Sequence, residues 1–203
     1  MTTVRKIELE SIFLISMVAL ASLYFVVQRN NQGINVRVAS PTNQESQEDI
    51  YSQISPDGTK EVVARVVQNQ DNTKTFSFYT KDTAQSAEKL IFSKAIGDTA
   101  SMKIPYNTWS SNNQYFFIEE NDASGKSVLA FRADGLPFSE EEPYFDVTDL
   151  FAKRETGHIF DEATGWASES LIIINTTKDD GTKGPSYWFE VPSKVVLILA
   201  TEF

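Results

Sequence analysis

The stretch Ile54-Ser55-Pro56-Asp57-Gly58-Thr59-Lys60 has the composition of a tight turn and leads directly into an apolar run. Pro presets one φ angle, Asp can bond to its own backbone, and Gly accepts positive φ, so Pro-Asp-Gly favours a β-turn. The residues that follow, Glu61–Val67, are mostly β-branched and apolar, as in a strand. The stretch therefore predicts a β-hairpin.

Two further copies of this stretch follow. Trp109-Ser110-Ser111-Asn112-Asn113 and Trp166-Ala167-Ser168-Glu169-Ser170 align with residues 54–58, which places the leading residues 55 and 57 positions apart. Strands are expected at Glu61–Val67, Tyr115–Glu120 and Leu171–Thr176, around Phe78, Phe131 and Phe189, and at Lys89–Ser93, Tyr144–Thr148 and Lys194–Ala200. We therefore predict an all-β domain of three antiparallel β-meander units with no helix after residue 30. Ile54, Trp109 and Trp166 would be the core anchors of the repeat.

The turn at residues 54–60 resembles the W-S-P-D-G-K turn of the TolB-type, WD40-like β-propeller repeat. The same repeat occurs in the propellers that precede prolyl-peptidase hydrolase domains. The resemblance covers residues 49–203 and implies a partial or compact β-propeller-like fold. It implies no single function, because this repeat serves many roles.

Three units are fewer than the about four to eight blades that closed propellers typically have. An open arc leaves sheet edges exposed, and such edges invite pairing. Three solutions stay open: residues 31–53 add strands, the sheets pack into a compact barrel, or two chains close a six-blade ring. We favour a compact monomer, with a homodimer as the second choice.

The amino-terminal segment Ser11–Val27 has 17 residues without charge, glycine or proline. As a helix it spans roughly 26 Å, which is enough for the hydrocarbon core of a bilayer. We predict an uncleaved transmembrane helix. Two alternatives remain: a cleaved signal peptide, since Ala19-Leu20-Ala21 resembles a cleavage site, and a buried core helix.

The flanks of this segment predict its orientation. Residues 1–10 would form a short cytoplasmic amino terminus, and residues 28–48, without aromatics and rich in Asn, Gln and Ser, a flexible linker. Residues 49–203 would then lie outside the cytoplasm, as the domain of a single-pass membrane protein. The orientation rests on few charges, because Arg5 and Lys6 are nearly matched by Arg29 and Arg37.

Composition argues against several activities. The chain has no Cys and one His, and its formal net charge is −10, which argues against a Cys or His-pair metal site and against nucleic acid. His158 has no G-x-S-x-G nucleophile motif to serve, and no nucleotide-binding motif is present, so we expect no cofactor. Acidic runs at Glu140–Glu142 and Asp179–Asp180 lack the spacing of a calcium loop.

These observations predict a non-catalytic module that binds a protein or cell-envelope partner. The alternative is a hydrolase-like enzyme whose carboxylates are gathered by the fold. The candidate partner-binding residues are Leu136, Phe138, Glu140, Glu141 and Glu142, in a loop with an apolar tip beside three acids. The other reading of this loop is that Leu136 and Phe138 fold back onto the domain.

Overall fold

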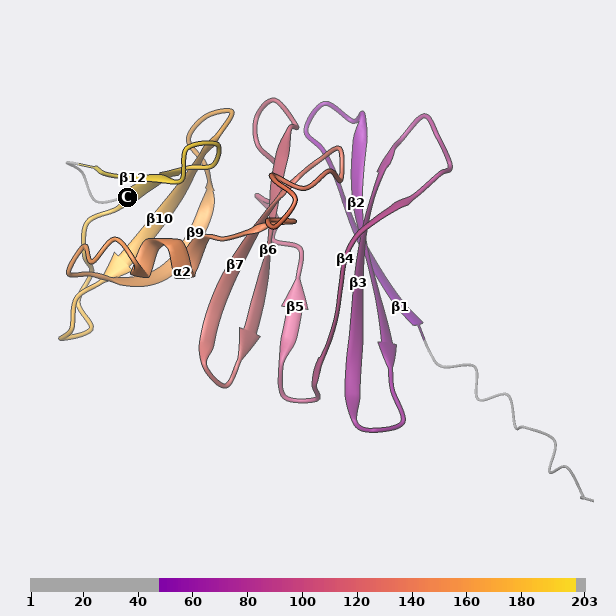
Figure 1. Cartoon of the computed structure of the whole chain (residues 1–203), viewed down its shortest axis with the longest axis horizontal. Coiled ribbons are helices and arrows are strands. Elements are labelled where there is room, and N and C mark those ends of the chain that lie inside the picture. Colours follow the sequence, from indigo (N-terminus) through magenta and orange to yellow (C-terminus); the bar gives the residue numbers. More distant parts are fainter. Residues whose placement is uncertain (1–47, 200–203) are drawn as a thin grey trace, which may run out of the picture. The chain divides into compact units, whose positions relative to one another are not determined.

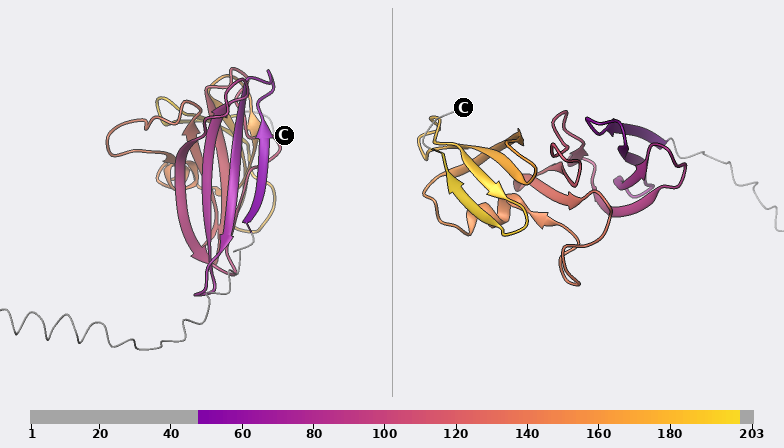
Figure 2. Two further views of the ribbon diagram at one scale, coloured as in Figure 1. Left: turned by 90° about the vertical axis from the view of Figure 1, so that its right-hand side faces the viewer. Right: turned by 90° about the horizontal axis from the view of Figure 1, so that it is seen from above.

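The computed structural model describes residues 48–199, which form three four-stranded antiparallel sheets (Figures 1 and 2). Sheet 1 holds β1 (Glu48–Ile54), β2 (Lys60–Gln68), β3 (Thr73–Asp82) and β4 (Lys89–Gly97); sheet 2 holds β5 (Ser101–Lys103), β6 (Tyr115–Asp122), β7 (Gly125–Arg132) and β8 (Phe145–Asp146); sheet 3 holds β9 (Ile159–Trp166), β10 (Leu171–Thr177), β11 (Tyr187–Glu190) and β12 (Val195–Ile198). Neighbouring strands in each sheet are consecutive in the chain. The prediction of an all-β domain of three antiparallel meanders is confirmed for these residues.

The turn that defines the repeat is built in the same way in sheets 1 and 2. Ser55 Oγ donates to Asp57 Oδ1 at 2.8 Å, and Ser110 Oγ donates to Asn112 Oδ1 at 2.9 Å. Gly58 and Asn113, one residue further on, have φ angles of 74° and 56°. Glycine and asparagine tolerate this left-handed backbone better than other residues, so the two turns keep one geometry with different sequences.

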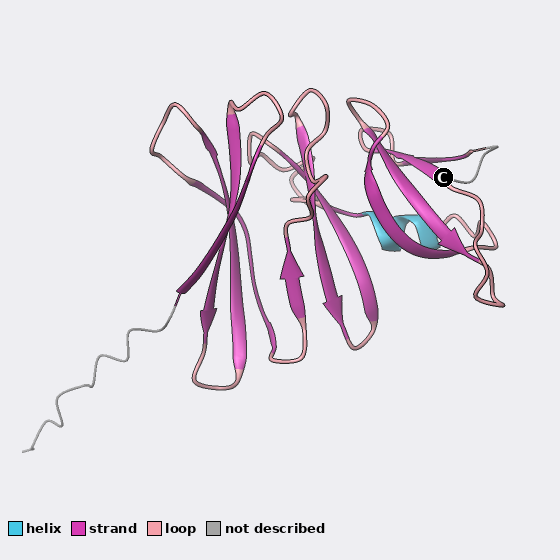
Figure 3. Ribbon diagram, turned by 180° about the vertical axis from the view of Figure 1, so that it is seen from behind, coloured by secondary structure: helices cyan, strands magenta, loops and turns pink. Residues whose placement is uncertain are grey.

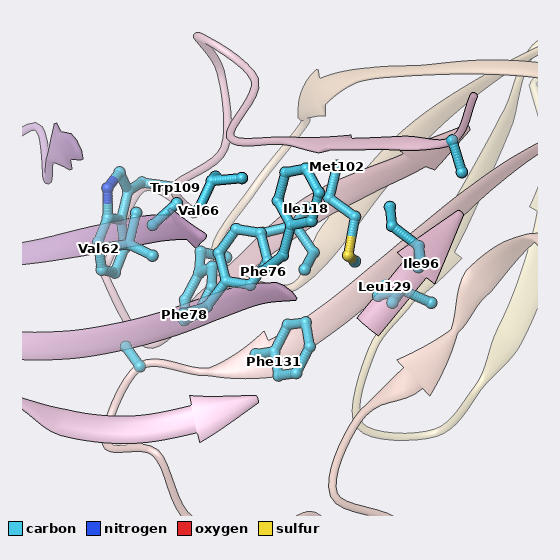
Figure 4. Close-up of a cluster of buried hydrophobic side chains, with 14 residues drawn as sticks. Val62, Val66, Phe76, Phe78, Ile96, Met102, Trp109, Ile118, Leu129 and Phe131 are labelled. Atoms are coloured by element: carbon cyan, nitrogen blue, oxygen red, sulfur yellow. The ribbon is translucent and has the colours of Figure 1, made fainter. Parts of the chain in front are cut away.

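Two hydrophobic clusters join the three sheets. The first lies between sheets 1 and 2 and holds Val62 and Phe78 on one side, Phe116 and Phe131 on the other (Figure 4 labels Val62, Phe78 and Phe131). The second lies between sheets 2 and 3 and contains residues such as Phe117 and Ile174. We call the face of a sheet toward the preceding sheet its front face, and the face toward the following sheet its back face. The back face of each of the first two sheets is therefore covered by the front face of the next.

The anchor tryptophans connect consecutive sheets through equivalent hydrogen bonds. Trp109 Nε1 donates to the carbonyl oxygen of Gln53 at 3.1 Å, and Trp166 Nε1 donates to that of Thr108 at 2.9 Å. In both cases the acceptor is the residue before the anchor of the preceding sheet.

Ile54 differs from the other two anchors. Its side chain is 53% exposed, whereas Trp109 is 6% exposed, and Trp166 packs against the second cluster. Ile54 pairs with Glu61, which places it on the front face of sheet 1, and no described sheet covers that face. The expectation that all three anchors lie in the core therefore does not extend to Ile54.

One helix corrects the sequence prediction. Tyr144–Thr148 was expected to be a strand, but only Phe145–Asp146 pairs with β7, and α2 (Val147–Ala152) follows at once (Figure 3, cyan). Asp146 caps α2 by accepting the backbone N–H of Asp149 at 3.0 Å. Buried Val147 and Phe151 give this short helix an apolar face, and two such positions are too few to reveal a helical period.

The predicted amino-terminal anchor Ser11–Val27 lies outside the described residues, as does most of the predicted linker. Within residues 48–199, no helix has the length and apolar character needed to cross a bilayer. The transmembrane helix therefore stays a prediction.

Candidate functional site

The loop of residues 133–143 connects β7 to β8 and holds all five candidate binding residues (reddish orange in Figure 1). Its start is fixed by Asp134, whose carboxylate pairs with Arg132 at 2.5 Å and accepts the backbone N–H of Leu136 at 2.9 Å. The ammonium group of Lys89 in sheet 1 donates to the carbonyl oxygen of Asp134 at 2.9 Å. The loop is thereby tied to the sheet that precedes its own.

Gly135 lets the loop lie close to sheet 1. Its φ angle is +65°, and a Cβ atom at this position would be 2.7 Å from Ile91 Cγ2. Any other residue would have to adopt a strained backbone and displace Ile91.

The middle of the loop folds back through Phe138. Its ring stacks on Phe145 with centroids 3.9 Å apart and lies parallel to Tyr115 at 6.1 Å. The backbone N–H of Phe138 donates to the carbonyl oxygen of Glu142 at 2.8 Å, which closes a tight turn. Phe138 therefore contributes to the structure of the loop.

The end of the loop is bound to sheet 3. Glu142 forms an ion pair with Lys194, whose ammonium group also lies 4.5 Å from the centre of the Phe145 ring. The hydrogen bond from Lys194 lowers the pKa of Glu142. Arg154 donates to the carbonyl oxygen of Lys194 at 2.7 Å, which holds the turn that carries this lysine. The loop thus contacts all three sheets.

The remaining candidate residues point away from these contacts. Leu136 is 50% exposed, and Glu140 and Glu141 are exposed. Leu136 and Glu140 line one hollow of about 310 Å³, and Phe138 and Glu142 line another of about 760 Å³. The structure therefore divides the five residues into two that hold the loop and three that it presents.

The larger hollow is lined mainly by polar groups from all three sheets. Lys60, Arg132 and Lys194 contribute its cations, and each has a carboxylate partner in Asp82, Asp134 or Glu142. Asn113, which is 5% exposed, has a buried side-chain oxygen without a hydrogen-bond partner. Sequence reasoning missed Asn113 and Lys194, because neither lies near the loop in the chain.

The anchor positions of the repeat meet at a third hollow of about 600 Å³, which Ile54, Trp109 and Trp166 line together. Tyr106, 85% exposed, lies at its edge and was also missed by the sequence analysis. Gly165 at this hollow has a φ angle of +140°, and a Cβ atom there would be 3.1 Å from Asn107 Cβ. This close approach brings sheets 2 and 3 together.

The groups considered for catalysis have structural partners. His158 Nδ1 lies 2.8 Å from Tyr187 Oη, beside the second cluster. The buried carboxylates Glu119 and Glu120 are neighbours on β6, so they point to opposite faces of sheet 2. Each has its own lysine, Lys103 at 2.8 Å and Lys94 at 2.6 Å. Within the described part of the chain, no three metal-ligating side chains form a group that could hold a metal ion.

Comparison with known proteins gives a distant structural likeness. No protein-family model and no curated protein matches the chain. Among solved structures, it is similar to that of "putative TolB" from Agrobacterium tumefaciens, with a TM-score of 0.34 and 9% sequence identity. The similarity covers 72% of this chain and 63% of that one, so the chain spans less than two thirds of that protein.

Proposed function

We propose that this chain is a membrane-anchored binding module whose three-sheet domain lies outside the cytoplasm and captures a protein partner through residues 133–143. One observation carries this proposal: the loop is tied to all three sheets, yet it exposes Leu136, Glu140 and Glu141. A loop on a rigid scaffold is a common place for recognition, because its contact residues are already ordered before binding.

The exposed chemistry of the loop favours a basic partner with an apolar contact point. Leu136 and Pro137 offer apolar surface, Glu140 lines the same hollow, and Glu141 is the next exposed carboxylate of the loop. The formal net charge of −10 extends the same sign over the chain as a whole. Opposite charge on the partner would accelerate encounter, and salt would slow it.

We further propose that the domain has a propeller-like form. Each sheet would be a blade, and the repeated indole-to-carbonyl hydrogen bond joins consecutive blades. Three blades then make a compact arc, and residues Ser11–Val27 would hold this arc at the membrane.

A non-catalytic role is supported by where the buried carboxylates lie. General acid and base catalysis by two carboxylates needs both groups to face one substrate. Glu119 and Glu120 face opposite sides of sheet 2, and each is neutralised by a lysine. This arrangement suits a structural role for both residues.

The proposal is tested by affinity capture from envelope extract. The full-length chain is compared with a triple variant, Leu136→Ser, Glu140→Gln and Glu141→Gln, which leaves Phe138 and Glu142 to hold the loop. We expect the wild type to capture a basic protein and the variant to lose it. The captured amount should fall as salt is raised.

A matched control makes the same change in charge elsewhere on the surface. Tyr106→Ser, Glu169→Gln and Asp179→Asn remove one exposed aromatic and two exposed carboxylates without touching the loop. Equal loss of capture in both variants, or equal retention, would contradict a role for residues 133–143.

A further inference from the structure

The smaller hollow beside the loop, of about 310 Å³, has an apolar lining with two charged residues. Its apolar residues come from sheet 1, sheet 2 and the loop, and they are Ile91, Phe131, Leu136, Pro137 and Pro143. Its charged residues are Arg132 and Glu140. Most of this lining suits a hydrocarbon stem, so the charged residues decide which group the stem carries.

The walls of the hollow are already fixed in the free chain. The register of β4 with β3 passes from Leu90 to Phe92 and leaves Ile91 as the extra residue of a bulge, a feature that redirects a side chain. Cγ2 of Ile91 would lie 2.7 Å from a Cβ atom at Gly135, so the loop lies directly against this side chain. Phe131, 2% exposed, belongs to the first hydrophobic cluster. A partner would therefore meet a hollow that needs no rearrangement to form.

Arg132 does not repel a second cation from this hollow. Its Nε and Nη2 atoms donate to the two carboxylate oxygens of Asp134 at 3.2 Å and 2.5 Å. A guanidinium group in such a forked contact has its charge balanced by the carboxylate. The ammonium group of Lys89 donates to the carbonyl oxygen of Asp134 at 2.9 Å and is not part of the lining.

Glu140 supplies a carboxylate that is still available for a partner. Among the residues that the structure describes, no cation forms an ion pair with Glu140, whereas Asp134 and Glu142 in the same loop each pair with one. The hollow therefore combines an apolar lining with one carboxylate that lacks a counter-ion. This combination is complementary to a cationic side chain with an aliphatic stem.

The neighbouring Glu141 lies outside the lining and provides an internal comparison. Backbone hydrogen bonds between Ser139 and Glu142 close a turn that has Glu140 and Glu141 at its centre. Both glutamates are exposed, but only Glu140 lines the hollow. The two residues carry the same charge in the same turn and differ in their position relative to the hollow.

We propose that this hollow binds an arginine side chain of the basic partner. The aliphatic stem would lie on Ile91, Leu136 and Pro137, and the guanidinium group would donate to the carboxylate of Glu140. Arginine suits the site better than lysine, because a guanidinium group is less strongly hydrated and forms two parallel hydrogen bonds with a carboxylate. This inference rests on the proposed function and adds the residue type by which the partner is recognised.

Methyl NMR of the full-length chain in mild detergent tests the pocket. The probes are capped tripeptides with alanine on both sides of arginine, of lysine, or of citrulline, the uncharged analogue of arginine. The arginine peptide should shift the methyl signals of Ile91 and Leu136 with a millimolar dissociation constant. The signals of Ile50, 56% exposed on the front face of sheet 1, should not move. Citrulline should bind at least about fivefold more weakly, and lysine should lie between the two.

Two single variants locate the charge that recognises arginine. Glu140→Gln should weaken binding of the arginine peptide by about fivefold or more, whereas Glu141→Gln should change it by less than about twofold. Both remove one exposed carboxylate from the same turn, so a general effect of net charge would appear equally in both. Equal losses in the two variants, equal binding of arginine and citrulline, tighter binding of lysine, or no shift at Ile91 and Leu136 would each overturn the proposal.

Affinity capture from envelope extract separates this inference from the proposed function. Glu140→Gln alone should lose most of the captured basic protein, and Glu141→Gln should retain it. If only the triple variant at positions 136, 140 and 141 loses the protein, the arginine pocket is wrong and the loop remains the binding surface. If the triple variant also retains the protein, residues 133–143 are not the binding surface and both proposals are wrong.

Discussion

The indole of Trp166 donates its hydrogen bond to the carbonyl oxygen of Thr108, the residue directly before Trp109. Trp109 makes the equivalent bond to Gln53, directly before Ile54. The repeat in the sequence is therefore also a repeat of contacts. Each tryptophan anchor donates a hydrogen bond to the backbone carbonyl of the residue before the preceding anchor. Ile54 has no N–H donor in its side chain and lies half exposed on the front face of sheet 1, which no described sheet covers.

Substitutions at Trp109 and Ile54 should distinguish a buried, hydrogen-bonded anchor from an exposed one. Trp109→Ala should lower the free energy of unfolding by about 3–5 kcal/mol, because it removes a large buried side chain and a hydrogen bond. Ile54→Ala should cost about 0.5 kcal/mol or less, because its side chain is half exposed. Urea unfolding of the full-length chain in detergent, followed by circular dichroism, measures both. Similar losses at the two positions would contradict the different roles of Trp109 and Ile54.

The turn in sheet 1 should depend on pH through Asp57. Hydrogen bonds from the backbone N–H of Thr59 and the hydroxyl of Ser55 lower the pKa of Asp57 from 3.8 to about 2. The lowered value means that the carboxylate stabilises the fold above about pH 4 and that this contribution is lost as the pH falls through about 2. Asp57→Asn should remove this dependence and keep the turn, since Asn112 occupies the equivalent place in sheet 2.

The reciprocal change supplies the control for this prediction. Asn112→Asp should add an acid-dependent contribution of the same sign to sheet 2. Urea midpoints of the three chains between about pH 5 and pH 2 test both changes. Parallel pH profiles for wild type and Asp57→Asn would show that this carboxylate does not stabilise the turn.

Gly135 should fix the position of the loop. Gly135→Ala combines a positive φ angle with a contact of 2.7 Å to Ile91, whereas Gly157→Ala meets nothing within 4 Å at a φ angle of +76°. We expect about 1 kcal/mol of destabilisation at Gly157 and about 2–3 kcal/mol at Gly135. Gly135→Ala should also reduce partner capture. If both variants lose equal stability and keep full capture, the loop does not depend on this contact.

The local elements of the fold could be predicted because their signals are local. The turn at residues 54–60 and its copy at residues 109–113 are defined by residues that prefer those backbone angles. Strand β6 was predicted at Tyr115–Glu120 and observed at Tyr115–Asp122. Helix α2 was missed because six residues with two buried positions show no helical period, and its cap at Asp146 resembles any acidic loop residue.

The features that depend on tertiary structure could not be predicted. Lys194, which holds the loop through Glu142, is separated from the loop in the chain by α2 and three strands of sheet 3. In the sequence, Glu61 and Lys81 look like ordinary surface charges, but the strand register pairs them at the position where sheet 2 has the buried pair of Phe116 and Phe131. The different roles of Leu136 and Phe138 could not be predicted either, because the two residues are close in sequence and differ only in how the folded loop exposes them.

The membrane placement has a direct test of its own. If Ser11–Val27 spans the bilayer uncleaved, the chain should stay with membranes after a carbonate wash and should retain Met1–Val27 by mass. This follows because a membrane-spanning helix of 17 uncharged, mostly apolar residues is released by neither high pH nor salt. Recovery of a chain that begins at Ser22 would instead show a cleaved signal peptide.

Photo-crosslinking in intact cells, from a benzophenone amino acid placed at Leu136, measures whether residues 133–143 contact a partner. The exposed side chain at this position touches whatever binds the loop, and Tyr106, 85% exposed on another surface, serves as the comparison site. A binding module of the proposed kind should give a defined crosslinked product with a basic protein from Leu136 and not from Tyr106. No product from Leu136, or the same products from both positions, would contradict the assignment of residues 133–143 as the binding surface.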